Sequence, residues 1–315
     1  MNEPLIDMRV WRQFVAVAEE LHFGRAAQRL HITQPPLTQA IAQLEKTLGV
    51  GLFERTSRRV LLTPAGEALL PDVRELLARA QALPARARAA ARGEVGRVRL
   101  AFVSTVGFEQ LPAWVRAFRE QCPQVALDLV ESTGDVQLRM LERGEIDAGL
   151  LLHTPGHAPA GLAHLRVGTE PLVLALPEHH PLAAAPTLAW DAVLPEPLVI
   201  FPRRIAPSLH DAVVGLYHAA GRQPLVAQEA IQMQTIVNLV SAGIGLAWVP
   251  ESVMQFRRSG VVYRTPGAAT PRRAAAAPAM RVPVCETGMV WREGGVAPAL
   301  ARFIAFVRAQ ADAGP

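Results

Sequence analysis

The chain has 315 residues, enough for two or three domains, and half of them are hydrophobic, which is ample for packed cores. Its net charge of +4 is mild, so any DNA affinity must come from where the arginines are placed rather than from overall charge. No apolar run reaches the roughly 18 residues of a membrane helix, and no signal region begins the chain, so we expect a cytoplasmic protein with no membrane partner.

The chain begins with a helix predicted over residues 8–21, followed by two shorter helices joined by a tight turn. In the second of these, from about Gln34, Leu37, Ile41 and Leu44 recur at spacings of four and three residues, which makes one buried stripe. The other face carries short polar side chains that can reach base edges in the DNA major groove. This pattern is typical of a helix-turn-helix, although an αα-hairpin with a solvated polar face has the same pattern.

A basic hairpin follows the two helices. Residues 53–63 predict a strand, a turn and a second strand, with Arg55, Arg58 and Arg59 placed to meet phosphate. Arginine-rich hairpins are common on solvated edges, so the hairpin alone would indicate little. A helix-turn-helix followed by a basic wing predicts a DNA-binding domain.

A long helix is predicted from about Pro64 to Arg92, with Thr63 as its cap. Pro71 and Pro84 lie inside it, and we expect a bend near Pro84 or an end there. Its apolar residues follow the three-and-four alternation of a coiled-coil seam, or of a helix packed on its own domain. These residues are Leu69, Val73, Leu76, Ala80 and Leu83.

From Arg97 onward strands alternate with helices, which predicts parallel sheets covered by helices. A first lobe is predicted from strands at residues 98–103, 125–131 and 146–152 with helices at 111–121 and 136–143. A second lobe starts near Gly168, with strands at 172–176, 198–201 and 226–230, helices at 209–220 and 233–242, and a glycine turn that leads into a strand within 243–250; residues 261–263 end the lobe. Residues 266–278 have low complexity and predict a surface insertion, after which a strand at 281–291 and a helix at 299–309 return to the first lobe.

The sequence carries no recognised enzyme motif: there is no GxSxG, HExxH, Walker loop or GxGxxG. His153, His157 and His164 gather in one Pro/Gly-rich loop, and we expect solvated loop histidines there rather than a metal site. Cys122 and Cys285 give no disulfide framework and no metal-ligand spacing, so two buried thiols are expected.

Ligands of open α/β lobes bind beyond the carboxyl ends of strands, where helix N-termini favour an anion. Three loops in such places offer hydroxyls, an aromatic wall and a guanidinium, which together suit a small carboxylate. The candidates are Ser104, Thr105, Ser132, Thr133, Phe201, Pro202 and Arg203, with Met233 and Gln234 as second-rank candidates. For each residue an ordinary turn or cap role is the alternative.

A family resemblance rests on the run FVAVAEELHFGRAAQRLHITQPPLTQAIAQLEKTLGVGLFERTSRRVLLTPAGEALL. It is similar to the N-terminal domain of LysR-type transcriptional regulators, densely so over residues 8–70, and the order and length of the remainder also resemble that family. The resemblance implies an α/β chain with an N-terminal all-α winged helix-turn-helix, a long linker helix and a two-lobed, periplasmic-binding-protein-like effector domain. The implied bounds are 1–64, 65–92 and 93–315, with lobe I at 97–167 and 280–315 and lobe II at 168–265.

The resemblance also implies roles for particular residues. It places base contacts on Gln34, Pro35, Thr38 and Gln39, and because many relatives have arginine where this chain has Gln39, we expect a different base preference there. Five of the cleft residues fall at positions matching the family's effector site: Ser104, Ser132, Thr133, Phe201 and Pro202.

The chain looks closest to the regulators of aromatic-compound catabolism, whose effectors include muconates. The effector expected is therefore a muconate-like or aromatic carboxylate, and no other cofactor is expected. Several muconate-responsive relatives carry an arginine just after the third strand, where this chain has Leu151 to His153, so the match is incomplete.

Expected partners are double-stranded promoter DNA, a second copy of the chain through the linker helix, further copies in a homotetramer, and RNA polymerase if the protein is an activator. Two alternatives remain open. A cytoplasmic solute-binding sensor is disfavoured because no export signal is seen, and an enzyme using the interlobe cleft is disfavoured because the sequence has no paired carboxylates and no nucleophile–base motif.

Overall fold

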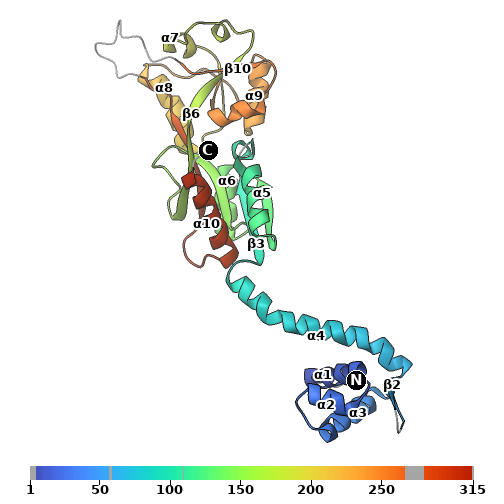
Figure 1. The fold of residues 1–315 in the computed structure, drawn as a ribbon. Helices are drawn as coiled ribbons and strands as arrows, with labels where there is room; N and C mark the ends of the chain where they lie inside the picture. Colours follow the sequence, from blue (N-terminus) through green and yellow to red (C-terminus); the bar gives the residue numbers. More distant parts are fainter. Residues whose placement is uncertain (1–4, 57–58, 109, 267–279, 314–315) are drawn as a thin grey trace. The chain divides into compact units, whose positions relative to one another are not determined.

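The computed structural model describes residues 5–56, 59–108, 110–266 and 280–313. By its contacts the chain divides into two compact units, Met1–Arg88 and Ala89–Pro315. The predicted fold class is confirmed in both units, with a winged helix-turn-helix in the first and two α/β lobes in the second (Figure 1). None of the helices in the described part of the chain has the length and apolar composition of a membrane-spanning segment.

The N-terminal unit is built from three helices, a two-stranded wing and the first part of a long helix. Its elements are α1 (Met8–Glu20), α2 (Phe23–Arg29), α3 (Gln34–Leu48), β1 (Phe53–Arg55), β2 (Val60–Leu62) and α4 (Pro64–Ala91). Helix α1 begins where the side chain of Asp7 accepts a hydrogen bond from the backbone N–H of Arg9. The stripe of Leu37, Ile41 and Leu44 is fully buried, and so α3 has one side fixed in the core and the other in solvent.

The apolar residues of the predicted seam on helix α4 lie in two different environments. Val73 and Leu77 are buried in the core of the N-terminal unit, with Leu69 packed against it. Leu76 and Leu83, one heptad apart, are instead 40% and 60% exposed. The first part of the helix therefore packs on its own domain, and a coiled-coil seam through the exposed leucines stays a prediction. The helix runs to Ala91, close to the predicted Arg92, so it does not end at Pro84, and the alternative of a bend there stays a prediction.

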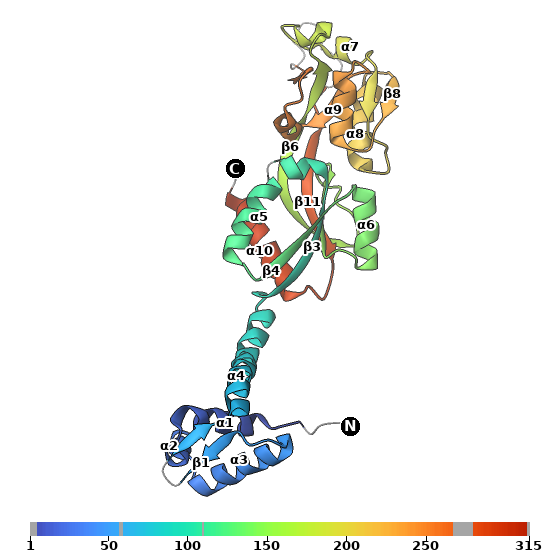
Figure 2. The ribbon, with the colours of Figure 1, turned by 90° about the vertical axis from the view of Figure 1, so that its right-hand side faces the viewer.

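Lobe I is a sheet with helices on both faces. Its elements are β3 (Gly96–Phe102), α5 (Gln110–Gln121), β4 (Val125–Glu131), α6 (Gly134–Arg143), β5 (Ala148–His153), β11 (Val284–Arg292) and α10 (Pro298–Ala313). Strand β3 pairs in parallel with β4 and β5, as the βαβαβ pattern predicts, and β11 closes the sheet in antiparallel pairing with β5. Helices α5 and α10 cover one face and α6 the other (Figure 2).

The passage between the lobes differs from the prediction. One strand of 16 residues, β6 (Leu162–Pro177), replaces the predicted strand at 172–176 and begins well before Gly168, where the second lobe was expected to start. Its first part pairs with β11 in lobe I, and its last part pairs with β9 (Ala247–Pro250) and β10 (Val261–Arg264) in lobe II. The two lobes therefore share a continuous strand.

The rest of lobe II packs around the end of β6. Its further elements are α7 (Trp190–Val193), β7 (Leu198–Ile200), α8 (Pro207–Ala219), β8 (Val226–Glu229) and α9 (Met233–Ser241). Short 3₁₀ helices that were not predicted lie at Ser104–Phe108, Pro181–Ala183 and Glu251–Phe256, and α7 was not predicted either. The predicted surface insertion lies, from residue 267 on, outside the described residues.

Two predictions about reactive side chains have different outcomes. Cys122 and Cys285 are buried free thiols, as expected. The prediction of solvated loop histidines is correct for His157, is wrong for His153, and for His164 is wrong only about the loop, because that residue is exposed but lies in a strand. His153 ends β5 and is only 3% exposed, and His164 lies within β6.

Candidate functional site

The exposed side of α3 gathers the predicted base-reading residues. Gln34, Pro35 and Gln39 are exposed and Thr38 is half-buried, and with Ala42 they line one shallow hollow. The hydroxyl of Thr38 donates to the carbonyl oxygen of Gln34 at 3.1 Å, which fixes its rotamer and leaves its lone pairs available. The hollow therefore presents amide and hydroxyl groups on a rigid helix whose opposite side is buried.

The wing is tied to α3 by a residue that sequence reasoning missed. One carboxylate oxygen of Glu45 accepts the backbone N–H groups of Leu52 and Phe53, at 2.9 and 3.0 Å. The other accepts from the guanidinium of Arg55 at 2.7 Å, and that guanidinium also lies 4.9 Å above the ring centroid of Phe23. Arg55 thus has a structural role in the wing, and its phosphate contact stays a prediction.

Of the other two arginines predicted in the wing, only Arg59 lies among the described residues. The side chain of Arg59 is exposed, and its backbone closes the turn by exchanging hydrogen bonds with Thr56. Arg58 lies outside the described residues.

Between the lobes is a narrow pocket that encloses about 50 Å³ of free space. It is lined by Val103, Ser104, Thr105, Ser132, Thr133, Gly134 and Leu152 of lobe I, and by Phe201, Ile205, Ala206, Leu209, Ile231, Gln232 and Met233 of lobe II. Six predicted effector residues are therefore brought together here: Ser104, Thr105, Ser132, Thr133, Phe201 and Met233. The apolar lobe II residues that complete the lining were missed, because isolated apolar residues carry no signal for a ligand site.

Three other predicted effector residues do not line this pocket: Pro202, Arg203 and Gln234. Arg203 is 64% exposed and makes a two-pronged ion pair with Asp211 of α8, both N–O distances being 2.7 Å. Its guanidinium lowers the pKa of Asp211 and is turned toward that carboxylate. Gln234 instead lines a separate open groove beside α5.

Two hydroxyl groups at the pocket have no hydrogen-bond partner among the described residues. Oγ1 of Thr105 and Oγ of Ser132 are both buried from solvent, whereas the hydroxyl of Thr133 is engaged by Asp135. Such unpaired groups are uncommon in protein interiors, because each retains its desolvation penalty of about 1–3 kcal/mol. Both residues line the pocket, so a ligand oxygen that came within hydrogen-bonding distance of either hydroxyl would satisfy it.

The backbone around the pocket suits a negative charge. Helix α6 begins at Gly134 and α9 begins at Met233, both in the pocket wall, so their N-terminal N–H groups and dipoles lie close to it. No arginine or lysine is present among the lining residues. The site can therefore stabilise an anion by oriented N–H groups and hydroxyls rather than by a cationic side chain.

The two lobes are in close contact at the start of α6. A Cβ atom built on Gly134 would lie 2.7 Å from the backbone oxygen of Ile205 in lobe II, which is closer than real Cβ contacts. Glycine is thus required there for the lobes to meet as they do.

Comparisons with known proteins agree with this architecture. Residues 8–67 match the family described as bacterial regulatory helix-turn-helix protein, lysR family, and residues 91–312 match the LysR substrate binding domain. The chain is 46% identical over 296 residues to the transcriptional regulator IlvR of Caulobacter vibrioides, covering 94% of this chain and 95% of IlvR. It is 39% identical over 262 residues to AlsR of Bacillus subtilis, covering 82% of this chain and 85% of AlsR.

A solved structure of full-length CbnR, complexed with its target DNA, superposes with a TM-score of 0.76 at 32% identity. The superposition covers 97% of this chain and all of that one. Together, these matches extend over both units and include helix α3 and the residues of the interlobe pocket. The chain therefore belongs to the LysR family of bacterial transcriptional regulators.

Proposed function

We propose that this LysR-type regulator is controlled by a small carboxylate bound between its two lobes. The observation that carries the proposal is that Thr105 and Ser132, whose buried hydroxyls have no partner among the described residues, line the same pocket as the first residue of α6. A carboxylate oxygen accepts from both a hydroxyl and an N–H group, which is what this wall of the pocket offers. The apolar lobe II wall, including Phe201, would then cover the body of the ligand.

The lining favours a monocarboxylate. A muconate-like dianion brings a second charge, and no cationic side chain of the lining is available to meet it. The free space of about 50 Å³ is also far below the roughly 300 Å³ at which drug-sized ligand pockets begin. The lobes must therefore separate to admit a ligand, and a small aliphatic or aromatic monoacid needs the least separation.

A thermal-shift screen of the purified protein tests this proposal. The panel would hold aliphatic monoacids, benzoate, salicylate, protocatechuate and cis,cis-muconate. A bound acid at 100 times its dissociation constant should stabilise the protein by about 2.7 kcal/mol. We expect this response to be lost in Ser132→Ala and kept in Ser241→Ala, whose hydroxyl caps the end of α9 through the carbonyl oxygen of Asn238. A response that survives Ser132→Ala unchanged would place the ligand elsewhere.

We further infer that α3 reads DNA through Gln34, Pro35, Thr38 and Gln39, because these residues share the exposed hollow of that helix. Gln39 favours adenine, since a glutamine amide pairs with adenine N6 and N7. Gln39→Arg should shift the preferred base at one position toward guanine, whereas Gln43→Arg on the same helix should not. Selection of binding sites from a random DNA pool measures both. An unchanged profile in Gln39→Arg would contradict the assignment.

The proposal also covers the oligomeric state of the protein and its location in the cell. The exposed leucines of α4 support a dimer through this helix, and a two-fold dimer requires roughly palindromic half-sites. A homotetramer on promoter DNA, acting in the bacterial cytoplasm where the chromosome lies, completes the proposal. RNA polymerase is a further partner if the protein activates transcription.

A further inference from the structure

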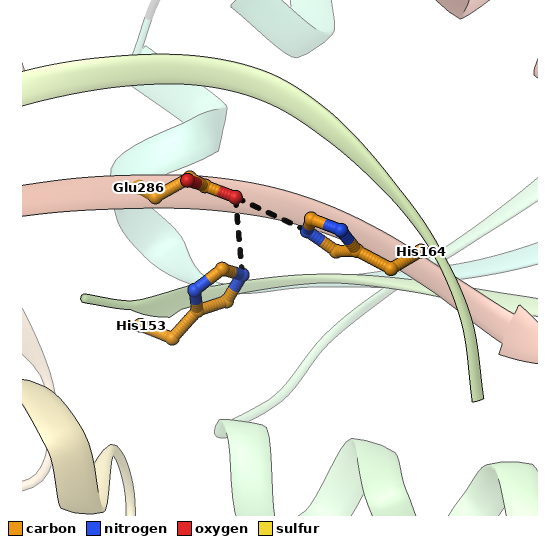
Figure 3. Close-up of side chains that lie close together, drawn as sticks. All are labelled: His153, His164 and Glu286. Carbon is orange, nitrogen blue, oxygen red and sulfur yellow. Dashed lines mark ion pairs between the residues drawn. The ribbon is translucent and has the colours of Figure 1, made fainter. Parts of the chain in front are cut away.

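Three side chains from separate strands meet on the sheet of lobe I, and none of them lines the interlobe pocket (Figure 3). His153 ends β5, His164 lies in β6 and Glu286 lies in β11, the strand that runs between those two. One carboxylate oxygen of Glu286 is 3.2 Å from Nε2 of His164 and 3.7 Å from Nε2 of His153. The cluster cannot be predicted from residue spacing, because Glu286 is more than 100 residues from either histidine in the sequence.

The hydrogen bonding of His153 sets its tautomer. Its Nδ1 lies 2.9 Å from the carbonyl oxygen of Thr154, which can only accept, so Nδ1 carries the proton. The other nitrogen, Nε2, is buried without a hydrogen-bond partner among the described residues. In the neutral ring its lone pair points toward the carboxylate of Glu286. The 3.7 Å gap is too long for a proton to bridge as a hydrogen bond.

The spacing of the three atoms fits a metal ion. In a tetrahedral site with bonds of about 2.0–2.1 Å, neighbouring ligand atoms lie about 3.3 Å apart. The two measured separations of 3.2 and 3.7 Å bracket that value, and all three ligand atoms lie within 4.8 Å of one another. A carbonyl oxygen holding the far nitrogen of a ligating histidine, as Thr154 holds His153, is also the usual second contact of such ligands.

The surroundings keep room for the cluster. A Cβ atom built on Gly288 would lie 2.6 Å from Nε2 of His153 and 2.8 Å from Nε2 of His164, so only glycine lets both rings turn inward there. The side chain of His164 is 26% exposed and gives an ion access from solvent.

We propose that His153, His164 and Glu286 form a binding site for a divalent transition-metal ion of the Zn²⁺ class. Two neutral imidazoles and one carboxylate suit such an ion and leave a fourth position for water. The site would clamp β5, β6 and β11 together beside the passage between the lobes. It also adjoins the interlobe pocket, because Leu152 lines that pocket and the N–H of Thr154 donates to Ser208 of α8.

Zn²⁺ and Co²⁺ titrations of the full-length protein, first stripped of metal with a chelator, test the proposal. We expect one Zn²⁺ ion per chain by calorimetry, and with Co²⁺ the intense visible absorption of a four-coordinate site. His164→Ala and Glu286→Gln should each weaken binding by at least about 100-fold, since removing even a second contact of a ligand weakens metal sites about 10–100-fold.

The control is His179→Ala, a 92% exposed histidine that also lies beside a carboxylate, that of Glu178. It should bind metal like the unaltered protein. Circular dichroism and the thermal midpoint without metal establish that each variant is folded. Absence of a stoichiometric ion, binding that survives His164→Ala, or equal weakening in His179→Ala would each overturn the proposal.

Discussion

The buried hydroxyl of Thr105 predicts opposite effects on stability and on ligand response. Thr105→Val keeps the shape of the side chain but removes an oxygen that has no partner among the described residues. Removing such a group relieves a desolvation penalty, so we expect the free energy of unfolding of the ligand-free protein to rise by about 1 kcal/mol. The response to the acid should be lost at the same time. Urea unfolding with and without the acid measures both effects, and a less stable ligand-free variant would contradict them.

A second prediction concerns pH and the ion pair that joins β3 to the start of β5. The Asp147 carboxylate accepts from the backbone N–H of Arg99 and from its guanidinium, at 2.8 and 2.6 Å. Burial opposes ionisation, but these hydrogen bonds outweigh it and lower the pKa of Asp147. Its contribution is therefore present above the unfolded-state pKa of about 3.9 and is lost as the pH falls through the lowered folded-state pKa.

Asp147→Asn should thus decrease the free energy of unfolding by about 1–2 kcal/mol at pH 7, after allowance for partial solvent exposure. The difference from the unaltered protein should shrink below about pH 4. The exposed pair of Arg97 and Asp128 is the control, and Asp128→Asn should change stability by less than about 0.5 kcal/mol. Urea unfolding across pH values measures both, and a pH-independent difference for Asp147→Asn would contradict the ion-pair explanation.

Single residues also show where sequence reasoning stops. Ser104 and Thr133 could be placed at the pocket because each follows a strand end, which is a topological rule. Arg203 was expected there for its charge, yet Asp211, eight residues further on, holds it at the surface. A guanidinium pairs with the nearest well-placed carboxylate, and that choice depends on three-dimensional geometry that residue spacing does not fix.

At the scale of elements, the exposed leucines of α4 indicate a surface for self-association. Leu83 is 60% exposed and lies one heptad from the exposed Leu76, and so the helix keeps apolar side chains that its own unit does not bury. Leu83→Glu should abolish the dimer while leaving the thermal midpoint of the N-terminal unit within a few degrees. Gln81→Glu, an exposed change of the same charge on the same helix, should leave the dimer intact. Sedimentation velocity separates these outcomes, and a dimer in Leu83→Glu would refute this surface.

Strand β6 shows why one element boundary was misplaced. The sequence predicts only a strand at 172–176, and Gly168 and Pro171 are residues that disfavour a regular strand before it. In the structure a register shift opposite Thr287 and Gly288 absorbs the irregularity, and the chain continues. The residues of β11 that pair with this part of β6 lie more than 100 residues away in the sequence, so the local sequence pattern does not reveal them. The alternating strands and helices of lobe I, in contrast, were predictable because their pairing is local.

At the scale of the whole effector unit, the contact between the lobes predicts how ligand binding is limited. Gly134→Ala would push a methyl group against the backbone oxygen of Ile205, so the lobes could not close as they do now. Overpacking of this kind costs the present, closed arrangement about 1–3 kcal/mol, and because the ligand needs the lobes further apart than this, affinity for the acid should rise about tenfold. Gly215→Ala on α8, where the methyl group meets open space, should leave affinity unchanged. Calorimetric titration of the acid distinguishes them, and equal affinities would show that this contact does not limit closure.

The central claim is that an acid in the interlobe pocket controls DNA binding by the helix-turn-helix. Fluorescence anisotropy of the full-length protein on DNA from upstream of its own gene, with and without the acid, tests it most directly. Because coupling between two sites typically amounts to about 1–3 kcal/mol, the acid should change DNA affinity about 5–150-fold. The change should be absent in Ser132→Ala, which should still bind DNA as the unaltered protein does without acid. An equal change in both proteins, or none in the unaltered protein, would contradict the claim.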